Sequence, residues 1–415
     1  MIAGVAGFWP RIRRRAVQIE AATMTRIRSR ASGANISRGR AFARVVAAAM
    51  VTIFSSAGVS TAQPYANGLP ADPHFFPIGV WLQSPRNAAE FAAIGINTFV
   101  GLDQGPTEAQ LSALAAHGMH AIAAQNDAAL ASPHAAVMRG WMLADEPDNA
   151  QRRGILGLSC TPPDEVAAAT RALKDKDRTR PVLINFGRGV AVPDWIGRGT
   201  CTGDVAYYAA ASKGADILAF DVYPVAGSPD HPGQLELVGK GVANLRRWTL
   251  PSQLVWADIE TTRISAQERV TPDQLKSEVW MALIHGANGI VYFVHEWTGG
   301  FREDGVFRYP ETIDAIRQID ATIKELAPIL NAPTSNGEIG VTSAVPIAML
   351  TKRYGTATYL FAIATSPLEG RASFTVGGVP SGAAKVVDEQ RTLPIVDGRF
   401  EDDFGPYATH AYKIE

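Results

Sequence analysis

Residues 140–148 read GWMLADEPD, a short apolar run that ends in acidic residues. Runs of this kind recur along the chain and alternate with segments of helical period, which is the pattern of repeated βα units around a parallel sheet. The predicted strands are FFPIGVWL (75–82), INTFVGL (96–102), MHAIAAQ (119–125), GWMLADE (140–146), PVLINFG (181–187), DILAFDVY (216–223), QLVWADIE (253–260) and GIVYFVHEW (289–297).

The number and spacing of these units decide the fold class. Eight βα units over roughly 250 residues favour a (β/α)8 TIM barrel, and the open doubly wound alternative lacks a glycine-rich phosphate turn after its first strand. Residues 338–415 consist of β-branched and aromatic runs separated by turns, with YGTATY (354–359) as the predicted hairpin. We therefore expect a barrel at 75–331, followed by a small C-terminal all-β sandwich at 332–415.

The first part of the chain has the pattern of a secretory signal. Residues 1–62 contain ten Arg, no Lys and one acid, Glu20, and the apolar run VVAAAMVTIFSSAGV (45–59) precedes small residues that end at Ala62. A basic region, an apolar stretch and a small-residue cleavage site are typical of a signal peptide. We expect cleavage near Ala62, a linker at 63–74 and a secreted or periplasmic protein. An uncleaved anchor and a disordered basic arm are the alternatives.

Charge and cysteine content narrow the partners of the mature chain. The whole sequence has a net charge of -1, and removing residues 1–62 with ten Arg and one Glu from 39 basic and 40 acidic residues leaves about -10. An acidic chain argues against nucleic acid as a partner, and no stable membrane insertion is expected after cleavage.

Cys160 and Cys201 lie in loop-like segments, so an exported protein would hold either a disulfide, which we favour, or two free thiols.

The carboxyl ends of the predicted strands are rich in carboxylates, amides and aromatic rings. In a (β/α)8 barrel the functional groups lie at these ends. Amides and carboxylates bind sugar hydroxyls, and flat rings stack on pyranosides. The candidate substrate-binding residues are Trp81, Gln125, Asp145, Asn185, Asp221, Tyr223, Asp258, Glu296 and Trp297. An oligo- or polysaccharide is the expected partner, and no cofactor is required.

Two glutamates stand where glycoside hydrolysis needs a pair of carboxyls. Glu146 and Glu260 end the fourth and seventh predicted strands, which face each other across the barrel. One such carboxyl acts as a general acid and the other, ionised, as a nucleophile in retaining enzymes. At this point GWMLADEPD (140–148), VWADIE (255–260) and GIVYFVHEW (289–297) resemble clan A retaining glycoside hydrolases.

The resemblance implies roles for individual residues. It makes Glu146 the acid/base, Glu260 the nucleophile, Tyr223 a hydrogen-bond partner of the nucleophile and Trp297 a platform for the sugar. It also implies a β-glycosidic bond cleaved by double displacement. The clan usually has Asn before the acid/base, and this chain has Asp145 there, which is typical of an outlying branch with DEP in place of NEP.

Several alternatives stay open. The barrel could bind glycan at the cell surface without cleaving it, and Glu296 is a rival nucleophile. A metal-dependent lyase or hydrolase would need Asp221, Asp258 and Glu296 to converge. No metal site is expected, because His295-Glu296 lacks the second His of an HExxH motif at Gly299. The sequence contains no GxSxG elbow of a serine hydrolase, and it is silent on the sugar and on the oligomeric state.

Overall fold

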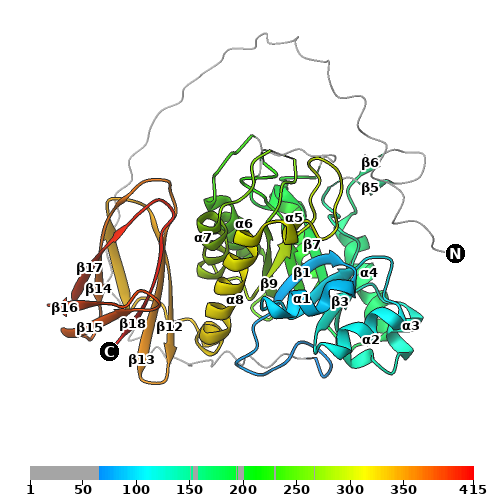
Figure 1. Cartoon of the computed structure of the whole chain (residues 1–415), viewed down its shortest axis with the longest axis horizontal. Helices are drawn as coiled ribbons and strands as arrows, with labels where there is room; N and C mark the ends of the chain where they lie inside the picture. The colour runs from blue at the N-terminus through cyan, green and yellow to red at the C-terminus, as the bar shows by residue number, and fades with distance from the viewer. Residues whose placement is uncertain are drawn as a thin grey trace, which may run out of the picture. The chain divides into compact units, whose positions relative to one another are not determined.

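The computed structural model describes residues 65–149, 151–152, 158–192, 194, 201–228, 230–265 and 267–415 (Figure 1). The predicted signal peptide at 1–62 lies outside these residues, and so do the first two positions of the predicted linker. Within the described part of the chain, no helix combines the length and the apolar character needed to cross a bilayer.

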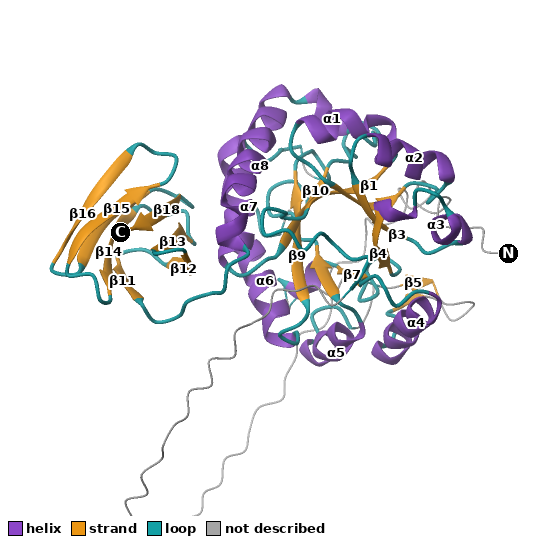
Figure 2. Ribbon diagram, turned by 90° about the horizontal axis from the view of Figure 1, so that it is seen from below, coloured by secondary structure: helices purple, strands orange, loops and turns teal. Residues whose placement is uncertain are grey.

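Eight parallel strands form a closed barrel, which Figure 2 shows as a ring inside a layer of helices. They are β1 (Ile78–Gln83), β2 (Thr98–Leu102), β3 (His120–Ala123), β4 (Met138–Met142), β7 (Val182–Phe186), β8 (Ile217–Phe220), β9 (Leu254–Glu260) and β10 (Gly289–Phe293). The last strand pairs with the first, with Ile290 opposite Ile78, so the ring closes. The (β/α)8 barrel expected from the sequence is confirmed, and β4, β7, β8 and β9 are its fourth to seventh strands.

The helices that cover the barrel follow its strands in sequence. They are α1 (Ala88–Ala93), α2 (Glu108–Ala116), α3 (Asp127–Ala131), α4 (Pro163–Lys176), α5 (Val205–Ala211), α6 (Glu236–Trp248), α7 (Pro272–Ile284) and α8 (Pro310–Leu330). Short 3-10 turns occur at η1 (Pro85–Asn87), η2 (Ala135–Val137), η4 (Arg188–Val190), η5 (Ser212–Gly214) and η6 (Gly305–Arg308), and a two-stranded ribbon at β5 (Gln151–Arg152) and β6 (Leu158–Ser159). Capping boxes at Thr107 and Thr271 satisfy the first amides of α2 and α7.

Alternating side chains along each strand build two apolar cores. Ile122, Leu183 and Trp256 belong to a buried cluster inside the barrel, whereas their strand neighbours belong to a larger cluster beneath the helices. This division follows because successive side chains of a strand point to opposite faces. The same alternation places Asn185, two residues after Leu183, and Asp258, two residues after Trp256, on the inner face at the carboxyl ends of their strands.

An antiparallel all-β domain follows the barrel. Its strands are β11 (Ile339–Ser343), β12 (Ile347–Tyr354), β13 (Ala357–Ala364), β14 (Gly370–Val376), β15 (Ser381–Val386), β16 (Arg391–Val396), β17 (Arg399–Phe404) and β18 (Thr409–Ile414). They form one sheet of order β11-β14-β17-β16-β15-β18-β13-β12. Phe374 of β14 lies 5.6 Å from Tyr412 of β18 between ring centroids, although these strands are not neighbours. The sheet therefore folds over its own core as a sandwich, and the predicted hairpin joins β12 to β13 with Tyr354 opposite Ala357.

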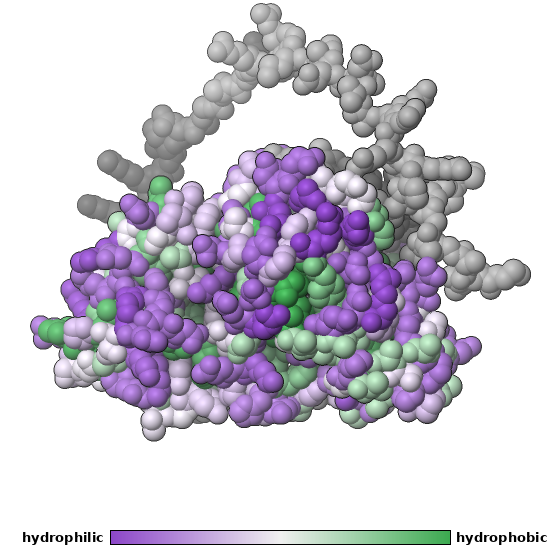
Figure 3. Space-filling model, in the orientation of Figure 1, coloured by the Kyte–Doolittle hydropathy of each residue, from purple (hydrophilic) through white to green (hydrophobic). Residues whose placement is uncertain are grey.

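The β-domain packs on the outer helices of the barrel. The Trp280 ring of α7 stacks on the Phe361 ring of β13 with centroids 5.6 Å apart. The Tyr407 hydroxyl donates a hydrogen bond of 2.7 Å to the Glu236 carboxylate of α6. Large apolar side chains are seldom exposed in the described residues, and the face shown in Figure 3 is accordingly mostly hydrophilic with scattered hydrophobic areas.

We predict that Phe374→Ala destabilises the β-domain by about 3–5 kcal/mol, the usual cost of deleting a buried aromatic ring. Phe374 is fully buried and its ring contacts those of Phe400 and Tyr412. Urea unfolding measures the change. Val396→Ala, at a side chain 61% exposed on β16, is the control and should leave the midpoint unchanged. Equal midpoints for the two variants would contradict this account of the core.

Candidate functional site

Four carboxyl groups come together at the carboxyl ends of the fourth, sixth and seventh barrel strands. Asp145 and Glu146 follow β4, Asp221 follows β8, and Asp258 lies on β9. The pKa of Asp221 is raised well above its ordinary value, first by burial and then by the negative charges of Glu146, Asp145 and Asp258. Asp221 and Asp258 are also backbone neighbours across a parallel bridge. The structure thus unites four residues from three strand ends that are well separated in sequence, between Asp145 and Asp258.

The proton affinities of these groups differ because their surroundings differ. Asp258 is 1% exposed, and its two carboxyl oxygens have no hydrogen-bond partner among the described residues. Burial, followed by the charge of Asp145, raises its pKa well above the ordinary range. Asp145 is partly open to solvent, but the surrounding protein removes much of the water from its carboxyl. This desolvation, followed by the charge of Glu146, raises the pKa of Asp145 to about 7. Asn185 opposes this shift by donating a 3.0 Å hydrogen bond to Asp145 Oδ1.

The backbone turn that carries Glu146 is fixed by its neighbours. Glu146 has a φ of 45°, and its N–H donates to the Asn185 carbonyl at 3.0 Å. The Asn149 side-chain amide donates to Glu146 Oε2 at 3.1 Å. A Cβ atom on Gly187 would lie 2.8 Å from Glu146 Oε1. Glycine at 187 therefore leaves the space that the half-buried Glu146 carboxylate needs.

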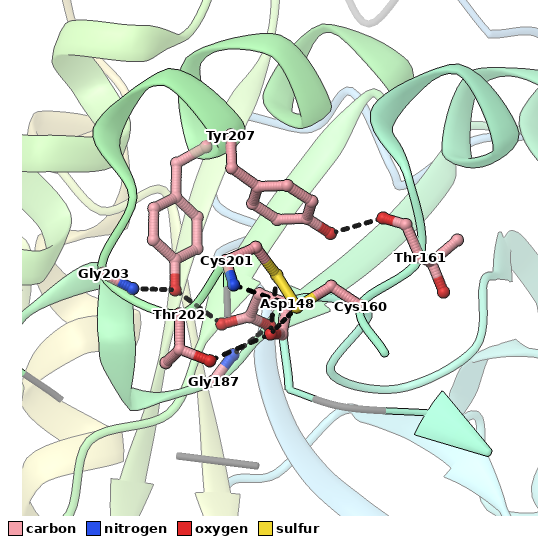
Figure 4. Close-up of a disulfide and its surroundings, with 9 residues drawn as sticks. Asp148, Cys160, Thr161, Gly187, Cys201, Thr202, Gly203 and Tyr207 are labelled. Atoms are coloured by element: carbon pink, nitrogen blue, oxygen red, sulfur yellow. Dashed lines mark hydrogen bonds between the residues drawn. A yellow bond between two sulfur atoms is a disulfide. The ribbon is translucent and has the colours of Figure 1, made fainter. Parts of the chain in front are cut away.

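Asp148, which was not predicted as a site residue, holds this turn in place through buried hydrogen bonds. It is fully buried, and its carboxylate accepts hydrogen bonds from the Tyr208 hydroxyl at 2.7 Å and the Gly187 N–H at 2.9 Å (Figure 4). Burial raises the pKa of Asp148 to about 6, and these two donors work against that rise. Asp148 thereby joins the turn after the fourth strand to the turn after the fifth and to α5.

The predicted cysteine pair is a disulfide between Cys160 and Cys201. Both sulfur atoms lie beside the Asp148 carbonyl oxygen, at 2.9 and 3.1 Å, and the Thr202 hydroxyl donates to the same oxygen at 3.1 Å (Figure 4). The crosslink therefore ties the loops that follow strands four and five around Asp148. No free cysteine remains.

Glu260, the predicted partner of Glu146, is the last residue of β9. Its side chain is fully buried, and its carboxylate accepts from the N–H groups of Val225 and Ala226 at 2.7 and 2.5 Å. These bonds, rather than one from the Tyr223 hydroxyl, hold it under the loop after β8. Burial raises the pKa of Glu260 to about 7, and the carboxyl of Glu278 on α7, also fully buried, lies against it.

Two other predicted substrate-binding residues have structural roles. The Gln125 side-chain amide donates to the Leu173 carbonyl of α4 at 3.0 Å, so Gln125 points outward from the barrel. Glu296 is fully buried and forms ion pairs with Arg263 and Arg308, while the Tyr309 hydroxyl donates to it at 2.9 Å. The Glu296 carboxylate is thus bound by two cations and a hydroxyl.

The predicted aromatic residues remain near the carboxyl ends of the strands. Trp81 is 6% exposed and packs in the core inside the barrel. Tyr223 is 9% exposed, and its pKa is raised well above the ordinary value by burial and then by the charge of Asp221. Trp297 is half-buried and lies 4.7 Å from Phe301 between ring centroids. Phe293, the last residue of β10, contacts Tyr223 with centroids 5.0 Å apart.

The metal-dependent alternative needed Asp221, Asp258 and Glu296 to converge. Glu296 is held by arginines, and in the ranges that the structure describes no group of three or more His, Cys, Asp or Glu side chains could hold a metal ion. The four carboxyls of the cluster are thus arranged as coupled acids. Their closeness can keep a proton on one carboxyl while a neighbour is ionised.

The chain is similar to known proteins in structure only. No protein-family profile and no curated protein matches its sequence. It is similar to the α-amylase of Geobacillus thermoleovorans complexed with acarbose, at 12% identity and a TM-score of 0.47, over 82% of this chain and 98% of that one. It is similar to a family 30 endoxylanase of Clostridium papyrosolvens, at 11% identity and a TM-score of 0.42, over 85% and 97%. A third is the family 27 β-L-arabinopyranosidase of Geobacillus stearothermophilus, at 10% and 0.42, over 74% and 60%.

We predict that the free energy of unfolding falls as the pH rises from about 4 to about 7. Asp145 and Glu260 have folded-state pKa values of about 7, above the values near 4 of an unfolded chain. The folded state binds more protons in this window, and it loses that advantage as the pH rises through the folded-state pKa. Urea unfolding at pH 4, 5.5 and 7 measures the slope.

Asp145→Asn should reduce this slope while keeping an acceptor for Asn185. Glu90→Gln, at an exposed acid of α1, is the matched control and should retain the wild-type slope. A slope that Asp145→Asn leaves unaltered would show that the cluster does not titrate as described.

We predict that replacing both Cys160 and Cys201 with Ala lowers the free energy of unfolding by about 2–4 kcal/mol. The crosslink joins positions 41 residues apart, and its removal restores loop entropy to the unfolded chain. Urea unfolding without reductant compares the double variant with the wild type. Dithiothreitol should bring the wild type down to the double variant, and equal stability before reduction would contradict the prediction.

Proposed function

We propose that the chain is a glycoside hydrolase that cleaves an oligo- or polysaccharide at the carboxyl ends of its barrel strands. The observation that carries the proposal is the cluster of Asp145, Glu146, Asp221 and Asp258, in which burial and neighbouring charges raise the pKa of the three aspartates, so that one carboxyl can hold a proton beside an ionised neighbour. Glycosidic hydrolysis requires this combination of one protonated and one ionised carboxyl. Aromatic rings beside the cluster supply surfaces on which sugars can stack.

Glu146 and Asp221 are the two carboxyls of the cluster that we assign to catalysis. Both side chains are partly exposed. Burial, followed by the charge of Glu146, raises the pKa of Asp221 well above its ordinary value, so Asp221 is the carboxyl of this pair that we assign as the proton donor. In this assignment Asp221 protonates the leaving oxygen, and Glu146 attacks the anomeric carbon in the double displacement that the sequence resemblance implies. Asp258, almost fully buried, maintains the cluster's high proton affinity.

The assignment implied by the resemblance alone is the competing one, with Glu146 as acid/base and Glu260 as nucleophile. Each Glu260 carboxylate oxygen accepts one backbone hydrogen bond, from Val225 or Ala226, which stabilises the carboxylate and lowers its reactivity as a nucleophile. The β-linkage is also part of the proposal and is supported by the resemblance alone. The two assignments share Glu146 and differ in its partner.

We predict that Glu146→Gln and Asp221→Asn each lower kcat on aryl glycosides by about 10²- to 10⁴-fold, the usual contribution of one acid-base group. Glu260→Gln should lose much less. Azide added to the Ala variants separates the assignments, because rescue with inverted product identifies the missing nucleophile. Inversion with Glu146→Ala supports the Asp221 assignment, and inversion with Glu260→Ala overturns it. Unchanged rates for all three Gln or Asn variants would overturn the hydrolase itself.

The burial of Glu260 is the one observation that favours a second function, a glycan-binding barrel without catalysis. Such a protein would bind polysaccharide and release no reducing ends over long incubation. Measurement of binding and of reducing-sugar release on the same polysaccharides decides between the two functions.

We also propose that the protein is exported and that its signal is cleaved near Ala62. The disulfide between Cys160 and Cys201 supports this, since such bonds persist in oxidising compartments and are rare in the cytosol. N-terminal sequencing of the protein recovered from its producing cells tests the cleavage site.

A further inference from the structure

A continuous row of rings leads away from the carboxyl cluster. The centroid of Tyr223 lies 5.0 Å from that of Phe293, and Phe293 lies 5.1 Å from His295. His295 lies 5.6 Å from Phe301, and Phe301 lies 4.7 Å from Trp297. The row therefore connects the end of the sixth strand to the loop that follows the eighth.

The inner rings of this row are buried or half-buried, and Phe301 at its outer end is exposed. Tyr223 is 9% exposed and lies within the field of Asp221 and Asp258, whose charges raise its pKa together with burial. His295 is 4% exposed, and its Nε2 lies 3.1 Å from the Leu82 carbonyl oxygen. Phe301 is 57% exposed, and Trp297 beside it is half-buried. One end of the row is thus at the cluster and the other is in solvent.

The exposed end is built on a fixed loop. Glu296 and Arg302 exchange two backbone hydrogen bonds of 2.9 Å, which close the loop between them. Gly299 and Gly300 have φ values of 83° and 117°, a region that other residues rarely adopt, so they permit this sharp reversal. The ion pairs of the buried Glu296 with Arg263 and Arg308 fasten its base.

Exposure of the large apolar Phe301 ring to water is unfavourable. Contact with a ligand would remove this cost. Leu82 of β1 is also exposed, at 39%, and its carbonyl oxygen lies beside the His295 ring. Pyranose rings have flat apolar faces that match exposed aromatic rings, whereas their hydroxyls match the carboxyls at the other end of the row.

We propose that Phe301 and Trp297 form a stacking platform for a sugar unit beyond the one held at the carboxyl cluster. This inference rests on the proposed function and adds a binding residue, Phe301, for a carbohydrate chain that extends from the cluster over the loop after β10. A single sugar at the cluster would leave Phe301 uncovered. Phe301 is therefore a binding residue for oligo- and polysaccharides.

The test uses retention in native gels cast with soluble xylan, mixed-linkage β-glucan or starch, and Glu146→Gln as the background so that the polymer stays intact. We expect Phe301→Ala to weaken retention in at least one of these gels by about three- to tenfold, the worth of one ring contact. Phe301→Tyr should restore it. Leu368→Ala, at a side chain 60% exposed in the β-domain, is the control and should be retained like the background.

The outcomes separate this inference from the proposed function. Phe301→Ala retained as strongly as the background, or a background retained by none of the three polymers, overturns the platform. Retention that depends on Phe301 without hydrolysis by the wild type keeps the platform and overturns the hydrolase. In the wild-type background, a loss of kcat/KM by Phe301→Ala that is larger on polymer than on aryl glycoside supports the platform, and equal losses overturn it.

Discussion

The parallel pairing of β1 with β10 is the constraint on which the site depends. Because every barrel strand runs in the same direction, closing the ring brings all their carboxyl ends to one rim. Residues at the carboxyl ends of β4, β8 and β9 then face a common centre, where their charges interact. An open sheet of the same strands would spread these residues along an edge. The concentration of acidic groups is thus a product of closure as much as of sequence.

The rim carries an energetic conflict that the rest of the fold must offset. Asp258 is buried without a hydrogen-bond partner among the described residues. The buried carboxyls of Glu278 and Glu260 lie next to each other under the loop after β8. Buried carboxyls of this kind cost stability, and the apolar layers on both faces of the strands supply the compensation. Acid chemistry at neutral pH needs this kind of raised proton affinity, so the conflict and the proposed activity have the same physical origin.

Much of the fold could be predicted from the sequence, because apolar runs of strand length and helical segments alternate without interruption. The identity of strand-end residues could also be predicted, but not the direction of every side chain. Asn185 stands two positions after the inward Leu183 and faces the cluster, whereas Gln125 stands three after the inward Ile122 and faces α4. Counting along the strand could have separated these two amides.

Other parts of the site depend on contacts between distant segments. Nothing near Glu260 in sequence shows that the N–H groups at 225 and 226 cover it, and the arginines that bind Glu296 come from two different loops. Asp148 lies two residues from Glu146, but its role depends on Tyr208 and Gly187, which come from later units. Phe301 lies in the loop after β10, away from the strand ends, so its position in the sequence does not mark it as a site residue.

The disulfide has a topological consequence. The covalent ring closed by Cys160 and Cys201 contains α4 and the whole of β7, the fifth barrel strand. A peptide bond broken anywhere inside that ring leaves both pieces joined through sulfur. The strand that carries Asn185 would then remain tethered beside Asp145, so a single proteolytic cut in this part of the chain would release no fragment.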